Sequence, residues 1–371
     1  RLARIGRMRR EKAMDSRRVR KIYELRGTVQ GVGFRPALYR LAREAALAGT
    51  AQNRASSVRL VLEGPRDTID TFVQDLPARL PSHARIENME EVECSTPPAG
   101  DAQTDFVILE SLDSGQILPS IPADLATCSA RRAEILDPAN RRYGYAFATC
   151  TDCGPRYTIV NGMPYDRDNT TMQRFHLCEE CRREYGAVTD RRFHAETNAC
   201  PRCGPRLILK HMDGSGTEGD ALRNARRALA EGKIVGVRGI GGFLLAADAF
   251  RSDTLRALRE RKRRPFKPFA VMTADVETAS RYVAVPQAGR DALMSAEAPI
   301  VILDARRDVA PVELPIDLIA PDMTTLGVML PTSPLHLLLM EGDGGDPTPR
   351  FDMLIMTSGN RGGEPICLTD E

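Results

Sequence analysis

Tryptophan is absent from the 371-residue sequence, and aromatic residues make up only 5% of it. Long apolar runs are also lacking: none approaches the roughly 18 residues of a membrane-spanning helix, so no membrane partner is expected. Neither sign of charge is in excess, because 52 basic and 50 acidic residues give a formal charge of +2. This balance argues against a protein that coats nucleic acid, and the hydrophobic fraction of 42% is typical of a globular protein.

A secretory leader is not recognisable at the start of the chain, which is a basic stretch with few apolar residues. We interpret residues 1–17 as a disordered tail, with Met14 as an alternative start, although a nucleic-acid-binding arm would carry the same charge. Without a leader, the nine cysteines are expected to stay reduced in the cytoplasm, which favours metal binding over disulfides.

Seven of the nine cysteines lie between Cys128 and Cys203, in a repeat of two units. A shift of fifty residues aligns the string C-T-D-C-G-P-R at 150–156 with C-P-R-C-G-P-R at 200–206. The second unit has two C-x2-C pairs separated by eighteen residues, which is the spacing of a zinc ribbon. We therefore predict a structural zinc ion that is bound by the thiolates of Cys178, Cys181, Cys200 and Cys203.

The first unit lacks one of these ligands, because Arg131 stands where the repeat has Cys181. No histidine near Arg131 replaces the missing thiolate, and His176 and His194 are interpreted as packing or surface residues. We expect this unit to bind zinc weakly, to use water as a fourth ligand, or to be empty. Its remaining cysteines are Cys128, Cys150 and Cys153.

A glycine-containing loop follows the first predicted strand, at 21–30, and precedes a predicted helix at 37–48. Glycines at 31 and 33 let the backbone curl so that amide groups point inward, and Pro36 falls near the first turn of the helix. Such an amide nest at a helix N-terminus binds anions, and Arg35 adds a bidentate fork.

Further strands are predicted at 49–53, 58–63, 85–92 and 106–110, with a helix at 67–76. The first six of these elements follow the order βαββαβ, which is typical of a ferredoxin-like sandwich. With the loop, residues 21–110 resemble the acylphosphatase family. That resemblance implies that Arg35 holds a phosphate and that Asn53 orients the attacking water. It also implies a phosphate-binding loop made of Gln30, Gly31, Val32, Gly33 and Phe34.

We predict an α/β domain for the last part of the chain, which follows a polar linker at 211–219. Helices are expected at 221–231 and 254–261, and strands at 234–237, 269–272, 300–303 and 354–356. The string K-R-R-P-F-K-P at 262–268 gathers cations that suit a triphosphate, and T-S-G-N at 357–360 follows a strand. Together these strings resemble the YrdC/Sua family, whose domain activates a carboxylate or carbamate with ATP. The resemblance implies nucleotide binding by Lys262, Arg264, Lys267, Thr357, Ser358 and Asn360.

The order of these parts resembles the HypF family, the carbamoyltransferases of hydrogenase maturation. Strings close to that family's are R-R-F-H-A-E at 191–196, L-G-V-M-L-P at 326–331 and P-L-H at 334–336. We therefore expect an α+β and α/β multidomain protein. Its predicted parts are a tail (1–17), an acylphosphatase-like domain (18–111), a tandem zinc-finger domain (112–207) and a YrdC-like domain (208–371).

The resemblance implies an enzyme that hydrolyses carbamoyl phosphate and activates the carbamate with ATP and magnesium as carbamoyl-adenylate. A further domain would then transfer the carbamoyl group to the C-terminal cysteine of HypE. The sequence ends at Glu371, so we expect the YrdC-like domain to be incomplete and the transfer domain to be absent. Leu244 and Ala247 also depart from the family, which usually has histidine and cysteine there.

Two other classes of function stay open. One is an acylphosphatase on an inactive zinc scaffold, which would release phosphate without ATP. The other is a tRNA-modification enzyme that uses the YrdC-like domain and basic ribbons, and it would bind RNA in a salt-dependent way. Near-zero net charge and few aromatic residues for stacking on bases argue against it.

Overall fold

The computed structural model describes residues 18–97, 103–112, 121–307, 314–360 and 363–369, so the predicted tail lies outside the described residues. The chain divides into two compact units. Unit 1 comprises Arg1–Ala123, Cys150–Asp152 and Ile159–Asn198, and unit 2 comprises Asp124–Thr149, Cys153–Thr158 and Ala199–Glu371. Each unit contains one β-sheet.

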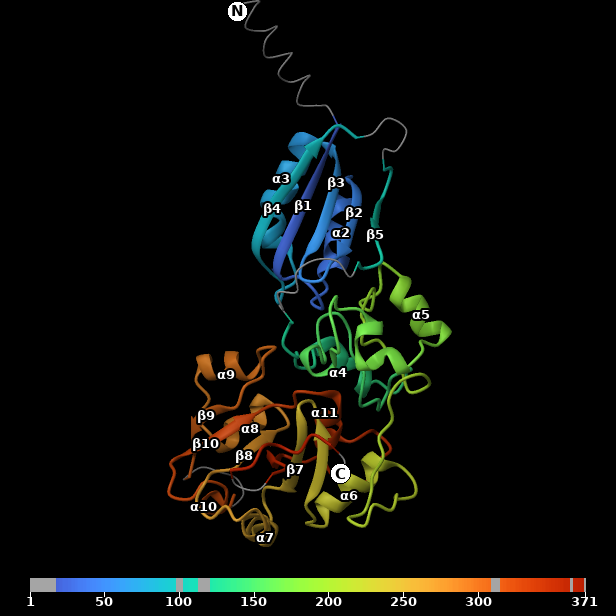
Figure 1. Cartoon of the computed structure of the whole chain (residues 1–371). Helices are drawn as coiled ribbons and strands as arrows, with labels where there is room; N and C mark the ends of the chain where they lie inside the picture. The colour runs from blue at the N-terminus through green and yellow to red at the C-terminus, as the bar shows by residue number, and fades with distance from the viewer. Residues whose placement is uncertain (1–17, 98–102, 113–120, 308–313, 361–362, 370–371) are drawn as a thin grey trace, which may run out of the picture. The chain divides into compact units, whose positions relative to one another are not determined.

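Unit 1 is built on a five-stranded sheet in the order β4-β1-β3-β2-β5, with two helices packed on one face (Figure 1). The pairs are antiparallel except for β2 with β5, which run parallel. This is the predicted ferredoxin-like sandwich, and its elements are β1 (Arg18–Thr28), α2 (Phe34–Glu44), β2 (Ala48–Asn53), β3 (Val58–Pro65), α3 (Arg66–Arg79), β4 (Arg85–Ser95) and β5 (Phe106–Ile108).

The core of this sandwich lies between the sheet and the helices. Helix α2 buries Leu38, Leu41 and Ala42, which are spaced three and four residues apart and so share one helix face. Strand β3 contributes Leu60 and Leu62, both fully buried. Packing of this density fixes the end of β1 against the start of α2, and the loop between them carries the candidate phosphate site.

The rest of unit 1 has little regular structure. Its elements are the short helices η2 (Arg167–Asn169) and η3 (Thr171–Arg174) and the α-helix α5 (Glu179–Gly186), while η1 is Tyr157–Ile159. Hydrogen bonds hold the segment together instead. The guanidinium of Arg167 donates to the carbonyl oxygens of Glu196 (2.5 Å), Asn198 (3.0 Å) and Phe175 (2.6 Å). One side chain thus joins parts of the segment that are far apart in sequence.

Unit 2 contains a six-stranded mixed sheet in the order β6-β7-β11-β8-β10-β9 (Figure 1). Strand β11 lies inside the sheet, and five of its six residues are buried. The strands are β6 (Val235–Gly239), β7 (Gly242–Asp248), β8 (Ala270–Thr273), β9 (Val301–Asp304), β10 (Thr325–Met329) and β11 (Met353–Ser358). The helices are α4 (Ser129–Leu136), α6 (Ala221–Ala230), α7 (Ser252–Lys262), α8 (Val276–Tyr282), α9 (Gln287–Leu293), α10 (Ile316–Ile319) and α11 (Pro334–Glu341). The predicted combination of α+β and α/β parts is therefore confirmed.

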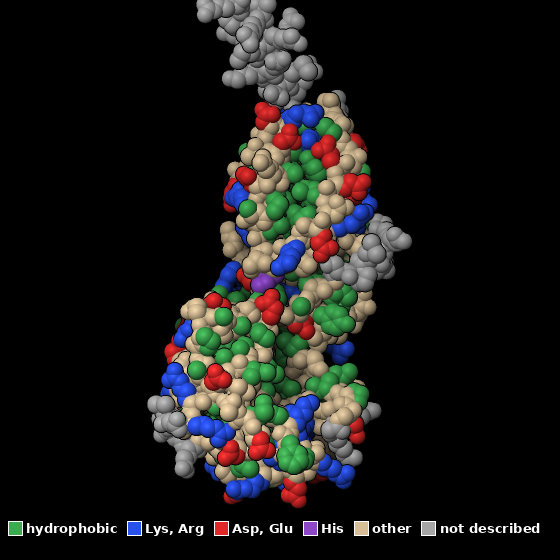
Figure 2. Space-filling model, turned by 90° about the vertical axis from the view of Figure 1, so that its left-hand side faces the viewer, with side chains coloured by type: hydrophobic (Ala, Val, Ile, Leu, Met, Phe, Trp, Pro, Cys, Tyr) green, Lys and Arg blue, Asp and Glu red, His purple; other side chains and the backbone are tan. Residues whose placement is uncertain are grey.

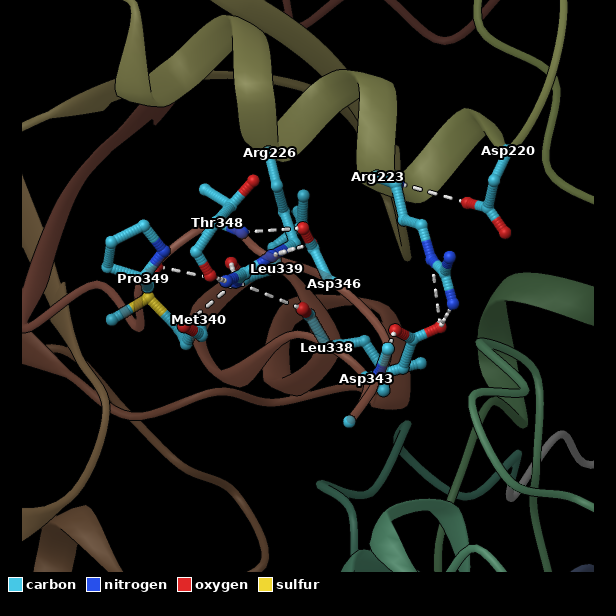
Figure 3. Close-up of polar contacts among 12 residues, drawn as sticks. Asp220, Arg223, Arg226, Leu338, Leu339, Met340, Asp343, Asp346, Thr348 and Pro349 are labelled. Atoms are coloured by element: carbon cyan, nitrogen blue, oxygen red, sulfur yellow. Dashed lines mark hydrogen bonds and ion pairs between the residues drawn. The ribbon is translucent and has the colours of Figure 1, made fainter.

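A fully buried arginine, Arg226 of α6, joins that helix to the C-terminal end of α11 (Figure 3). Its Nε donates to Asp346 at 2.6 Å, and its two terminal nitrogens donate to a set of backbone carbonyls. A cation is favoured where a helix ends, because the last carbonyl groups of the helix have no partners within it. The carbonyl oxygens that accept are those of Leu338, Leu339, Met340, Thr348 and Pro349.

Replacing Arg226 by methionine is expected to lower the free energy of unfolding by about 3–5 kcal/mol, because Asp346 would stay buried without its partner. Urea unfolding followed by circular dichroism measures the loss, since the chain has no tryptophan to report by fluorescence. Arg223→Met is the matched control. Arg223 lies on the same helix and pairs with Asp343 at 3.0 Å, but its side chain is 40% exposed, so a much smaller loss is expected. Equal losses in the two variants would contradict the prediction.

Charge is evenly distributed on the face drawn in Figure 2, where basic and acidic side chains of the described residues are interspersed. This face shows no basic stripe of the kind that follows a nucleic-acid backbone. Separately, none of the helices in the described part of the chain has both the length and the apolar character that a membrane crossing requires.

Candidate functional site

The loop predicted to bind phosphate joins β1 to α2 in unit 1. Gly31 and Gly33 have φ angles of +69° and +71°, in the left-handed region that glycine adopts without strain. The buried side chains of Val32 and Phe34 anchor the loop in the core. Helix α2 follows Gly33 directly, and no side chain in the described part of the chain caps its first amide groups. Uncapped amides at a helix N-terminus attract anions, so this geometry fits a phosphate.

Both ends of the buried Gln30 amide fix the loop in place. Its Nε2 donates to the carbonyl oxygens of Arg54 at 2.7 Å and Ser57 at 3.1 Å. Its Oε1 accepts from the backbone N–H of Tyr165 at 2.9 Å. The ring of Tyr165 also covers Gly31, where an added Cβ would lie 3.2 Å from it. The loop is therefore closely covered by the segment that contains Tyr165.

Arg35 is buried at the start of α2 and contacts two carboxylates from the part of unit 1 at Ile159–Asn198, which we call the cysteine-rich segment. Its Nη2 lies 2.9 Å from Oδ1 of Asp166 and 3.3 Å from Oε1 of Glu196. Its Nη1 makes one long hydrogen bond of 3.4 Å, to the hydroxyl of Ser111. One nitrogen of the fork is thus held firmly, and the remaining N–H groups are the ones placed to meet an anion.

Glu196 is itself held by several donors. The hydroxyl of Tyr185 lies 3.2 Å from Oε1 and 3.0 Å from Oε2, and the backbone N–H of Arg167 donates to Oε2 at 3.1 Å. Burial raises the pKa of Glu196 to about 7, against the opposing effect of the Arg35 charge. Burial, and then the charge of Glu196, also raise the pKa of Tyr185. The carboxyl group therefore sits in a rigid, poorly solvated position.

Asn53 is the last residue of β2 and only 1% exposed. Its Oδ1 is buried and has no hydrogen-bond partner among the described residues. A buried acceptor without a donor is costly, and it is often completed by a ligand or water. This atom is therefore available to orient a water molecule.

The two strings predicted to bind a nucleotide come together in unit 2. Nζ of Lys262, at the end of α7, donates to the carbonyl oxygens of Ser358 at 2.5 Å and Asn360 at 2.7 Å. Nη1 of Arg264 donates to the hydroxyl of Thr357 at 3.2 Å. Burial, and then the neighbouring charge of Arg264, lower the pKa of Lys262. Such crowding of buried cations favours a polyanion as their ligand.

A pocket of about 300 Å³ opens between these strings, and Lys262, Arg264, Lys267, Ser358 and Asn360 are among its lining residues. Arg263 also lines it, at a φ of +51°, in the left-handed region where a helix more often ends in glycine. Five of the six residues predicted for the nucleotide thus share one pocket, and the sixth, Thr357, is bonded to Arg264.

Leu244 and Ala247, the two departures from the family pattern, both lie on β7. Ala247 is fully buried in the core of unit 2, opposite Ile355 of β11. Leu244 is half-buried and pairs with Ser358, so it lies next to the predicted nucleotide residues. Of the two, Leu244 is the position from which a side chain could affect the pocket.

Cys178, Cys181, Cys200 and Cys203 form what we call the four-cysteine group, with all four Sγ atoms within 4.8 Å of one another. The Sγ atoms of Cys200 and Cys203 are 3.7 Å apart. Four zinc–sulfur bonds of about 2.3 Å in a tetrahedron would place the sulfurs about 3.8 Å apart. The group therefore fits zinc in ligand type, number and spacing.

Cys128, Cys150 and Cys153 form the three-cysteine group, whose Sγ atoms also lie within 4.8 Å of one another. Arg131, at the position of the missing ligand, is fully buried and forms an ion pair with Glu134. Among the described residues, three thiolates thus come together without a fourth. This group also fits zinc, with one coordination position left to another ligand.

Three family models match parts of the chain. The acylphosphatase model matches residues 21–108, and the model described as HypF finger matches 127–160 and 177–209. A model of the Sua5, YciO and YrdC proteins, described as telomere recombination, matches 227–371. Together they cover both the candidate phosphate loop and the candidate nucleotide pocket.

Curated relatives match almost the whole chain. Carbamoyltransferase HypF of Rhodobacter capsulatus is 44% identical over 347 residues, which are 94% of this chain and 44% of the relative. Carbamoyltransferase HypF of Synechocystis sp. is 40% identical over 93% of this chain and 43% of the relative. The chain belongs to the HypF family. It spans less than half the length of these HypF relatives.

Solved HypF structures have the same fold. The crystal structure of full-length HypF in the phosphate- and nucleotide-bound form covers 95% of this chain and 44% of that chain, with a TM-score of 0.84 at 38% identity. The crystal structure of T. kodakarensis HypF covers 94% of this chain and 43% of that chain, with a TM-score of 0.81 at 39% identity. The combination of domains in this chain is thus a known HypF arrangement.

Sequence reasoning missed the two acids that contact Arg35. Asp166 lies outside the cysteine repeat, and Glu196 belongs to the R-R-F-H-A-E string that resembles HypF. The fifty-residue shift does hold a signal, because it aligns Glu196 with Ala146 and so marks a departure from the repeat. His194, interpreted as a packing or surface residue, packs against Tyr185 with the two rings tilted and their centroids 5.0 Å apart.

Proposed function

We propose that this chain carries out the first two steps of a carbamoyl transfer. It hydrolyses carbamoyl phosphate in unit 1 and combines the released carbamate with ATP in unit 2, giving carbamoyl-adenylate and pyrophosphate. The observation that supports this most strongly is that one chain of the HypF family carries both an anion loop with a buried arginine and a cationic pocket of nucleotide size. The carbamoyl group would then pass to the C-terminal cysteine of HypE.

The hydrolytic step assigns separate roles to the residues of the loop. The amide groups of Gly31 to Phe34 and the N–H groups of Arg35 other than those on Nη2 would hold the phosphate. Oδ1 of Asn53, which has no other partner in the described residues, would accept from the attacking water. Water attacks phosphorus, the bond to the bridging oxygen breaks, and carbamate leaves. Fixed donors around a phosphoryl group supply most of the catalysis in such transfers.

The activation step would take place at the pocket of Lys262, Arg264 and Lys267. These cations would neutralise the triphosphate, and magnesium would enter with the ATP. Ser358 and Asn360, whose carbonyl oxygens accept hydrogen bonds from Lys262, would also contact the phosphates. A carbamate oxygen attacks the α-phosphate, and pyrophosphate leaves. The cysteine groups have a separate, structural role, with zinc in the four-cysteine group and a weaker site in the three-cysteine group.

Exchange of labelled pyrophosphate into ATP, measured with carbamoyl phosphate present, tests both steps together. The chain should support exchange, and Arg35→Ala should lose it, because no carbamate is produced. Arg40→Ala is the matched control, since Arg40 is exposed on the same helix. A solution of ammonium carbamate should restore exchange in Arg35→Ala, because the nucleotide pocket is unchanged.

The alternatives give different results in this experiment. Phosphate release that needs Arg35 but no exchange under any condition would leave an acylphosphatase on a zinc scaffold. Exchange that does not need carbamoyl phosphate, together with salt-dependent RNA binding, would indicate a tRNA-modification enzyme.

A further inference from the structure

Two carboxylates lie at a site that is otherwise built for an anion. Asp166 and Glu196 come from the cysteine-rich segment and not from the sandwich, yet both reach Nη2 of Arg35. One acid is enough to hold Arg35 in place, and a second one only adds repulsion toward a phosphate at the loop. The second acid therefore points to something that the bound molecule brings besides its phosphate.

The two acids differ in how many partners they already have. Both oxygens of Glu196 are occupied, by Arg35, Tyr185 and the backbone N–H of Arg167. Its side chain is only 2% exposed. Oδ1 of Asp166 accepts from Arg35, but the described residues offer no partner to Oδ2, and the side chain is 27% exposed. Asp166 therefore has a free acceptor beside the phosphate loop, while Glu196 fixes the arginine.

The substrates of such a loop differ in their acyl groups. Acetyl phosphate ends in a methyl group, which donates no hydrogen bond. Carbamoyl phosphate ends in an amino group with two N–H donors. A carboxylate oxygen close to the arginine that holds the phosphate would accept from this amino group, and it would meet only a methyl group in the acetyl compound. A buried or half-buried acceptor without a donor is costly, so this difference discriminates between the two.

We propose that Asp166 determines the specificity of the loop for acyl phosphates whose acyl group carries N–H donors, by accepting a hydrogen bond from the carbamoyl amino group. Glu196 is a positioning residue that holds Nη2 of Arg35 and leaves the other N–H groups of the fork to the phosphate. The inference rests on the proposed hydrolysis of carbamoyl phosphate and adds the residue that recognises its amino group.

The test compares the kcat/KM of the whole chain for carbamoyl phosphate and for acetyl phosphate, measured as phosphate release. The unaltered chain should prefer carbamoyl phosphate. Asp166→Ala should lower kcat/KM for carbamoyl phosphate by about 10–100-fold, the effect of one hydrogen bond to a charged group. Its kcat/KM for acetyl phosphate should stay the same or rise, so that the preference disappears. Asp168→Ala is the matched control, because Asp168 is exposed two positions away and should leave both values unchanged.

Other outcomes separate this inference from the proposed function. If Asp166→Ala lowers kcat/KM for both substrates equally, Asp166 only positions Arg35 and the inference is wrong, while carbamoyl phosphate hydrolysis stands. If the unaltered chain shows no preference between the two substrates, the inference is also wrong while carbamoyl phosphate hydrolysis stands. If the unaltered chain hydrolyses neither substrate, the inference and the proposed hydrolysis are both wrong. Asp166→Asn is a second variant, which keeps the shape of the side chain. The affinity of each variant for inorganic phosphate shows whether the loop is still folded. A variant that binds phosphate normally but has lost the preference supports the inference.

Discussion

Cys200→Ser is expected to remove one tightly bound zinc ion from the protein and to destabilise it more than any other single change considered. The four-cysteine group has the ligand number and the sulfur spacing of a tetrahedral zinc site, so losing one thiolate removes a quarter of its ligands. Structural zinc in finger peptides contributes about 10–16 kcal/mol of apparent binding free energy, which sets the upper limit of the loss. Zinc content after dialysis against a chelator, and thermal unfolding, measure the two effects.

Cys94→Ser is the matched control for this change. Cys94 is an exposed cysteine of β4 and belongs to neither cysteine group, so its loss should leave zinc content and thermal stability unchanged. A Cys200→Ser protein that keeps its zinc through dialysis would show that the metal is bound elsewhere. In the same experiment Cys150→Ser should have a smaller effect, because the three-cysteine group already lacks a ligand.

Arg35→Lys is expected to lower kcat for phosphate release from carbamoyl phosphate by about 10²–10³-fold, which is typical of losing a fixed donor to a transition-state charge. Lysine keeps the charge but not the planar fork, so it cannot bind the carboxylate of Asp166 with one nitrogen and the phosphate with the others. A fall in both kcat and kcat/KM would show that the lost interaction belongs to the transition state.

The controls for Arg35→Lys use the same helix and the same assay. Arg40→Lys changes an exposed arginine of α2 in the same way and should keep full activity. Decomposition of carbamoyl phosphate without protein is subtracted from every rate. An unchanged kcat with a raised KM would mean that Arg35 contributes only to binding, and would count against its proposed catalytic role.

Local patterns in the sequence predicted most of the fold. The seven elements of the sandwich and the cysteine pairs depend on spacings of a few residues, which a single sequence displays. Strand β7 was missed because Gly242–Asp248 does not alternate between polar and apolar residues. Its place in the sheet comes from pairing with β6 and β11, and β11 lies more than a hundred residues away along the chain.

The contacts around Arg35 could not be predicted in the same way. Arg35 and the loop were recognisable because their residues are adjacent in the sequence. Asp166 and Glu196 lie 131 and 161 residues from Arg35, and no periodicity connects them to it. Only folding of the cysteine-rich segment onto the sandwich within unit 1 brings these charges together. The nucleotide pocket could be predicted in part. Its two strings were each recognisable in the sequence, but only the sheet of unit 2 brings them together.

Arg263 shows where protein engineering on this chain would meet a conflict. A non-glycine residue in the left-handed region costs about 1–2 kcal/mol, so glycine at this position would be an obvious choice for a more heat-resistant variant. The same change would delete a positive charge from the wall of the nucleotide pocket. A library selected for thermal tolerance alone should therefore drift toward glycine here, and one selected for turnover of ATP should keep the arginine.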